Sequence, residues 1–183
     1  MNEKTNVGWI LRIVLLSIGI SIAFTFVSEV ALGGTGFVVS LLFLIVFILI
    51  GVIFDIIGIA VASASETPFH SMASHHEKGA AEAIRLIKNA GRVSSICNDV
   101  IGDISGIVSG SMVAAIGTML MGKVPFSKVV LQLALSGLVA GLTIGGKAVG
   151  KIAAIKNSTK IVLNVGKLLE FLSGLFQKQG ARP

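Results

Sequence analysis

The chain contains four long apolar segments that have no charged residues. Residues 30–54 contain no charged side chain over 25 positions, and residues 13–28, 104–122 and 129–146 share that property. Because hydrocarbon offers no water to backbone N–H and C=O groups, a segment that crosses a bilayer must be helical and needs about 20 mostly apolar residues. The pattern therefore predicts an all-α integral membrane protein with four transmembrane helices.

The first apolar segment, residues 13–28, is short enough to resemble the core of a signal peptide. A signal peptide follows such a core with small residues at a cleavage site, whereas here a longer apolar run follows residues 33–36. We expect a retained N-terminal helix in residues 1–34. A core over residues 35–146 and a basic tail over residues 147–183 complete the predicted organisation.

Basic residues are concentrated after the last apolar segment. By the positive-inside rule this tail is cytoplasmic. The connection at residues 123–128 is too short to be anything but a turn between antiparallel helices, so the orientation of the earlier helices follows by counting back. We predict a multi-pass protein of the plasma (inner) membrane with cytoplasmic N- and C-termini. The basic residues of the tail are Lys147, Lys151, Lys156, Lys160, Lys167, Lys178 and Arg182.

The amino-acid composition agrees with the prediction of a membrane protein. Hydrophobic residues make up 54% and charged residues 13% of the 183 positions, whereas soluble domains are roughly 25% charged. The net charge is +6. The basic residues border apolar helices and no aromatic stacking platform accompanies them, which favours the lipid bilayer over nucleic acid as a partner. The single cysteine, Cys97, excludes an internal disulfide and is expected to be a small buried residue.

The stretch at residues 68–92 contains an amphipathic pattern. Ser74 and Glu77 are spaced as in a capping box at a helix start. After them Ala80, Ala83, Ile84 and Ile87 line one face until Gly91, and charged residues occupy much of the other. We expect a short helix in the inner membrane interface. The basic tail has a similar apolar side, formed by Ile152, Ile155, Val162, Val165, Leu168 and Leu169.

Glycines recur at every fourth position in the last two apolar segments. Such a face lets another helix backbone approach closely, so the two faces are expected to pack on each other or to form a dimer. A second interpretation is that close approach exposes carbonyl oxygens able to coordinate a hard cation such as Mg²⁺. Both interpretations are compatible. The glycines are Gly102, Gly106 and Gly110, followed by Gly137, Gly141 and Gly145.

Polar groups at membrane depth are costly and therefore mark candidate functional positions. Asp99 and Asp103 share one helix face, and so do Ser63, Glu66 and Thr67. Two oxygen-rich clusters near the inner leaflet follow from this spacing. Alternatively, Asp99 and Asp103 cap a helix start, and Glu66 bonds backbone groups freed at a helix break before Pro68. The full set is Asp55, Ser63, Ser65, Glu66, Thr67, Asn98, Asp99 and Asp103.

Other chemistries are not indicated by the sequence. The spacing of His70, His75 and His76 fits no common zinc signature. No nucleophile-elbow, phosphate-loop or HExxH pattern occurs, so we do not expect an enzyme.

Several motifs resemble the transmembrane domain of the CNNM/CorC magnesium and cobalt transporters. Residues 63–69 (SASETPF) are similar to the family's S-G-x-E-T-A-L, and residues 77–80 (EKGA) to its E-G-x-x-G-A. Residues 95–100 (SICNDV) resemble S-x-x-x-G-N-N-L, and residues 146–151 (GKAVGK) stand where the family has G-E-x-L-P-K. The order, spacing and hydropathy agree over about residues 37–175.

The resemblance implies a homodimer with three core helices per protomer, an interfacial helix pair, a basic juxtamembrane helix and a bound Mg²⁺. Ser63 and Asn98 would supply side-chain oxygens and Gly146 a carbonyl oxygen. The family's acidic ligand falls on Lys147, whose ammonium has no lone pair and repels a divalent cation. The family's proline is replaced by Gly150, and its cytoplasmic CBS-pair and CorC-associated domains do not occur in this sequence.

Three functions are consistent with these observations. In a minimal transporter, Asp99, Asp103 or Asp55 would replace the missing carboxylate. In a non-transporting relative, Lys147 would occupy the former cation site and the protein would be a membrane partner or regulator. A structural module would assemble through its glycine faces. The position of Lys147 discriminates between the first two.

Overall fold

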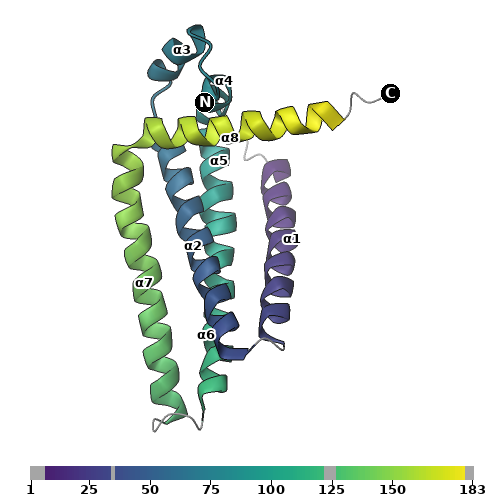
Figure 1. The fold of residues 1–183 in the computed structure, drawn as a ribbon, viewed down its shortest axis with the longest axis vertical. Helices are drawn as coiled ribbons and strands as arrows, with labels where there is room; N and C mark the ends of the chain where they lie inside the picture. Colours follow the sequence, from purple (N-terminus) through teal and green to yellow (C-terminus); the bar gives the residue numbers. More distant parts are fainter. Residues whose placement is uncertain (1–6, 34–35, 122–126, 180–183) are drawn as a thin grey trace. The chain divides into compact units, whose positions relative to one another are not determined.

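The computed structural model describes residues 7–33, 36–121 and 127–179, and these residues are almost entirely helical (Figure 1). Four helices in these ranges are long and apolar enough to cross a membrane, as predicted: Val7–Leu32, Gly36–Ser63, Ala90–Leu120 and Lys128–Lys156. The predicted turns at 33–36 and 123–128 lie partly outside the described residues. In chain order the elements are α1 (Val7–Leu32), α2 (Gly36–Ser63), α3 (Thr67–Ser74), α4 (Ala80–Lys88), α5 (Ala90–Ser95), the π-helix η1 (Ile96–Gly102), α6 (Asp103–Leu120), α7 (Lys128–Lys156) and α8 (Ser158–Gln179).

The chain divides into two units, which we describe separately. The first unit comprises residues 1–54 and 98–147, and the second comprises residues 55–97 and 148–183. The long helices α2 and α7 contribute residues to both units, and the predicted division at residues 34 and 146 stays a prediction.

The first unit is centred on α6. Its buried side chains recur every three or four residues, so one side of the helix is buried while other positions face outward. Helix α1 packs along α6, and the rings of Phe24 and Phe47 meet edge to face with their centroids 5.3 Å apart. Helices α2 and α6 approach closely where a Cβ atom on Gly51 would lie 3.1 Å from Ser105 Cβ. The buried cluster consists of Leu44, Phe47, Val100, Ile104, Val108, Met112, Val113 and Ile116.

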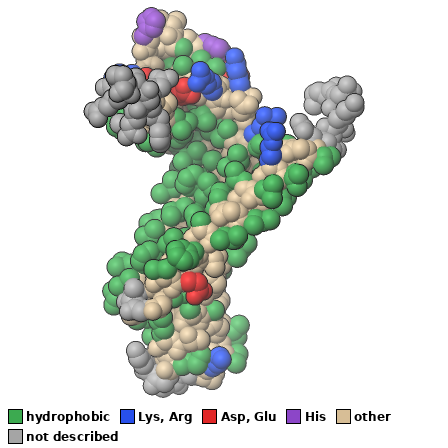
Figure 2. Space-filling model, turned by 90° about the vertical axis from the view of Figure 1, so that its right-hand side faces the viewer, with side chains coloured by type: hydrophobic (Ala, Val, Ile, Leu, Met, Phe, Trp, Pro, Cys, Tyr) green, Lys and Arg blue, Asp and Glu red, His purple; other side chains and the backbone are tan. Residues whose placement is uncertain are grey.

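Large apolar side chains remain exposed on the outer helices of this unit. Leu11 on α1 is 59% exposed and Leu133 on α7 is 69% exposed. Figure 2 shows hydrophobic side chains over much of the visible surface. A water-soluble monomer rarely exposes apolar surface on this scale. The distribution therefore matches helices that meet lipid.

The second unit is a smaller cluster around Phe69 of α3, which is fully buried. Its other buried apolar side chains are Ala60, Val61, Ala83, Ala154 and Val162. Helix α8 crosses the start of α4, where backbone meets backbone: a Cβ atom on Gly166 would collide with the Gly79 carbonyl oxygen. Gly79 itself has a φ of 80°, in the left-handed region that favours glycine. The two glycines therefore permit this crossing.

The expected capping box at Ser74 and Glu77 is wrong. Ser74 is the last residue of α3, and its hydroxyl donates to the Ser71 carbonyl. Helix α4 begins at Ala80 after the left-handed Gly79, and it ends at Lys88, with Asn89 as its C-cap, rather than at Gly91. The placement of Pro68 in the first turn of α3 is confirmed. A spacing of three residues thus fitted a capping box by coincidence, since Ser74 and Glu77 flank a helix end instead of a helix start.

We expect Gly166→Ala to destabilise the second unit by about 1–3 kcal/mol, because the added methyl group forces α8 away from the Gly79 carbonyl. Thermal unfolding followed by circular dichroism in detergent measures the effect. Gly174→Ala on the same helix is the matched control, since a Cβ atom there meets nothing within 4 Å. Equal melting temperatures for the two variants would contradict the close packing.

Candidate functional site

Asp103 and Lys147 form an ion pair between two membrane helices of the first unit. Lys147 Nζ on α7 lies 4.0 Å from Asp103 Oδ1 on α6. The lysine side chain is 26% exposed and the aspartate side chain 69% exposed. Most of the lysine side chain is thus covered by the protein, while most of the aspartate side chain is open.

This pair lies near one end of the apolar parts of α6 and α7. Asp103 begins α6, whose 18 residues span about 27 Å at ~1.5 Å per residue. Lys147 lies about 28 Å along α7 from Lys128 on the same scale. The hydrocarbon core of a bilayer is about 30 Å thick. If the α6–α7 connection lies at one membrane surface, the ion pair lies near the opposite boundary, where charges are less costly than at the bilayer centre.

Asn98 and Asp99 lie in the π-helix η1, which joins α5 to α6 without a break. A single π-helical turn is rare and often marks a functional position in a helix. Asn98 Oδ1 is buried, whereas Asp99 is exposed. Because the helix already runs from Ala90, the alternative in which Asp99 and Asp103 cap a helix start is wrong. Cys97 is 7% exposed, so its prediction as a buried residue is confirmed.

Gly146 lies beside Lys147 on α7. A Cβ atom on Gly146 would lie 3.4 Å from Val52 Cγ2 of α2. Gly146 and Lys147 are half-buried, unlike the neighbouring Gly145, which is exposed. The structure thus brings Gly146, Lys147 and Asp103 into one region of the first unit.

The predicted packing of the two glycine faces on each other is wrong. Cβ atoms on Gly106, Gly110, Gly137, Gly141 and Gly145 would meet nothing within 4 Å. On α7 the half-buried residues Gln132, Leu135, Val139, Thr143 and Lys147 follow one helical face, and the glycines at 137, 141 and 145 are exposed.

A groove with a volume of about 210 Å³ separates α6 from α7 beside Gly106 and Gly110. Two of its hydroxyl groups bond within their own helices, since Ser109 donates to the Ser105 carbonyl and Thr143 to the Val139 carbonyl. Dimer formation through the glycines stays a prediction.

The remaining candidate residues belong to the second unit. Ser63 ends α2 and is exposed. Glu66 precedes α3 and lies 3.3 Å from His70 Nε2, while Thr67 Oγ1 lies 3.4 Å from the Ser65 hydroxyl. Asp55 lies within α2 and is half-buried. Their participation in a site with Asn98 and Gly146 stays a prediction.

Among the described residues, no group of three or more His, Cys, Asp and Glu side chains is placed to hold a metal ion. Comparisons of the chain with protein-family models, curated proteins and solved structures give no match. The likeness to CNNM/CorC transporters therefore rests on the motifs of the sequence alone.

Sequence reasoning missed the pairing of Asp103 with Lys147, although it singled out both residues. Each is the first charge met on leaving the short α6–α7 connection, by way of residues 104–122 and 129–146. Antiparallel helices place residues at equal distances from their connection side by side. The similar lengths of these two uncharged segments were therefore the available signal.

We expect Asp103→Asn and Lys147→Met each to lower the thermal stability of the protein in lipid nanodiscs, because each removes one of the two charges of this ion pair at the membrane boundary. The double variant should recover part of the loss, with a coupling of about 1 kcal/mol. Melting temperatures of the four proteins measure this coupling. Strictly additive effects would show that the pair has no energetic role.

Proposed function

We propose that this chain is a multi-pass membrane protein with a core similar to that of a divalent-cation transporter, in which the Lys147 ammonium takes the place of the cation. Such a protein is a non-transporting partner or regulator in the membrane. The observation that carries the proposal is the 4.0 Å approach of Lys147 Nζ to Asp103 Oδ1. Asp103, one of the carboxylates expected to replace the family's acidic ligand in a transporter, already has a cation beside it.

Electrostatics supports this assignment. Two unit charges 4 Å apart interact by about 4 kcal/mol at an effective dielectric constant of ~20. A Mg²⁺ ion carries two charges, so an ammonium at this distance would oppose its binding about twice as strongly. Magnesium also requires oxygen ligands in octahedral geometry, and Lys147 supplies none.

A partner role is supported by the surface of α7. The exposed glycines at 137, 141 and 145 form a smooth stripe between exposed leucines such as Leu138 and Leu142. Small residues at this spacing let a second helix pack closely in lipid. A second copy of this chain or another membrane protein would fit this surface.

Magnesium transport is the second candidate function. It is favoured by the π-helix, which carries Asn98 and Asp99 together with the buried Oδ1 atom. In this mechanism Mg²⁺ displaces Lys147 from Asp103, and Ser63, Asn98 and Gly146 provide the further oxygens that the family resemblance implies.

Calorimetric titration of the purified protein with Mg²⁺ distinguishes the two functions. We expect no saturable binding to the wild-type chain and binding to Lys147→Glu, because the substitution replaces a repelling ammonium by a carboxylate ligand. Binding to Lys147→Glu should disappear when Asn98→Ala is added.

Lys151→Glu is the control, since it makes the same charge change one turn further along α7 at an exposed position. Saturable binding to the wild-type chain that is lost in Asn98→Ala would reject the non-transporting role and favour transport. Equal binding to Lys147→Glu and Lys151→Glu would show that only overall charge matters.

A further inference from the structure

Helix α8 is amphipathic, but α4 covers only one edge of its apolar side. Val162 and Gly166 are buried in the second unit. Further along the helix, Leu168 is 56%, Leu169 37% and Leu172 40% exposed. At 100° per residue these three leucines fall on one side of α8, roughly opposite Gly174. This leucine face has no cover among the described residues of the second unit.

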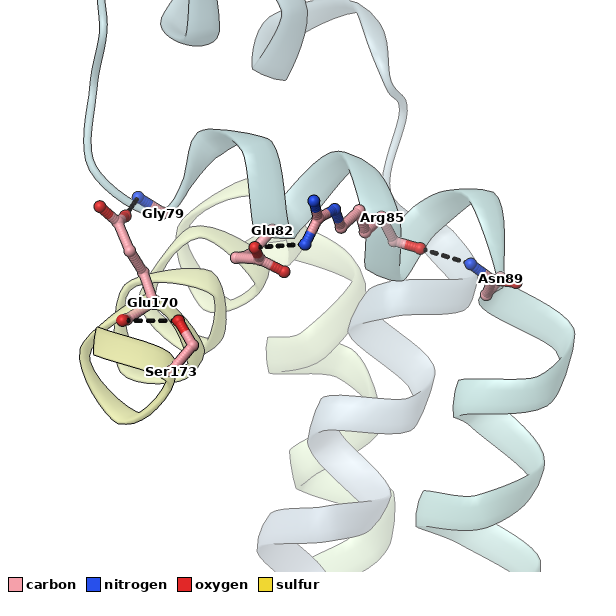
Figure 3. Close-up of polar contacts among 6 residues, drawn as sticks. All are labelled: Gly79, Glu82, Arg85, Asn89, Glu170 and Ser173. Atoms are coloured by element: carbon pink, nitrogen blue, oxygen red, sulfur yellow. Dashed lines mark hydrogen bonds and ion pairs between the residues drawn. The ribbon is translucent and has the colours of Figure 1, made fainter. Parts of the chain in front are cut away.

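Polar contacts with the start of α4 set the rotation of α8 about its own axis. The Glu170 carboxylate accepts a hydrogen bond from the Gly79 N–H group, and Ser173 donates to the Glu170 carbonyl (Figure 3). Lys167 Nζ lies 3.4 Å from Glu77 Oε1. Together with the Gly79–Gly166 contact, these interactions place the leucine face away from α4. Its exposure is therefore a property of the packed unit.

The membrane is the nearest apolar medium to this face. Helix α7, one of the four candidate membrane helices, ends at Lys156, and α8 begins at Ser158. A single residue, Asn157, separates them, and the uncharged run of α7 ends at Gly146, about 18 Å before Ser158 at ~1.5 Å per residue. The start of α8 therefore lies within about 18 Å of the end of this apolar run. Helix α8 is not itself among the candidate spans. An amphipathic helix of this kind lies in the plane of the interface.

The basic residues near α8 indicate that the membrane surface it meets is anionic. The chain from residue 148 onward contains six basic residues and one acidic residue. Lys167 is paired with Glu77, whereas Lys151, Lys156 and Lys160 are exposed around the α7–α8 junction. Anionic lipids attract lysines near the bilayer surface by about 1 kcal/mol each.

We propose that α8 docks on the bilayer surface, with the leucine face in the headgroup and acyl boundary and the junction lysines on anionic phospholipid headgroups. The contact between Glu170 and Gly79 positions the helix for this docking. This inference does not depend on whether the core binds Mg²⁺.

The test uses the full chain in nanodiscs of phosphatidylcholine, with or without phosphatidylglycerol. A fluorescent probe is attached to Leu172→Cys in a Cys97→Ala background, and quenching by lipids labelled at known depths locates it. We expect the probe about 5–10 Å below the headgroups when phosphatidylglycerol is present. Lys156→Gln with Lys160→Gln should reduce the docked fraction, by about fivefold per lysine in the docked-to-undocked ratio.

Gly174→Cys in the same background is the matched control, because its Cβ atom meets nothing within 4 Å and points to the opposite side of α8. Its probe should stay in water. Equal exposure of both probes to water, or docking that ignores phosphatidylglycerol, would overturn the proposal. Efficient disulfide crosslinking through Leu172→Cys would overturn it in favour of a second copy of the chain.

Discussion

In hydrocarbon, a backbone N–H or C=O group can bond only to the protein itself, and the rest of this structure depends on that constraint. It keeps the segment from Ala90 to Leu120 helical throughout, even where the geometry changes to a π-helix. It also explains why hydroxyl groups inside the membrane helices bond to carbonyls of their own helix, as Ser105 and Ser109 do.

Once the backbone is satisfied, helix association depends on shape. Lipid tails are as apolar as leucine, so close approach of backbones replaces the hydrophobic drive of a soluble core. Gly51 provides such an approach, since a Cβ atom there would lie 3.4 Å from the Gly102 carbonyl oxygen, whereas Gly117 makes room for the side chain of Gln132. The longer glycine stripe on α7 is left exposed. Within the part of the chain that the structure describes, a Cβ atom on these glycines would meet no neighbour, and the proposed partner role rests on this stripe.

Charged residues are the third structural feature, and they lie near or beyond the ends of the apolar segments, where a charge costs less than at the bilayer centre. Asp103 and Lys147 meet near one end of α6 and α7, so the protein supplies a cation to its own carboxylate. The lysines at the α7–α8 junction lie beyond the apolar part of α7. In our proposal the same residue type neutralises a carboxylate at the membrane boundary and binds anionic headgroups outside it.

The sequence by itself determined the four membrane helices, because bilayer thickness translates directly into the length of an uncharged run. It also placed Pro68 in the first turn of a helix, a local backbone property, and that helix begins at Thr67. It did not reveal the ion pair, the π-helix or the contact of Gly79 with Gly166. It also misassigned Ser74 and the glycine faces. These features depend on how each helix is rotated about its axis, and packing between residues distant in the chain decides that rotation.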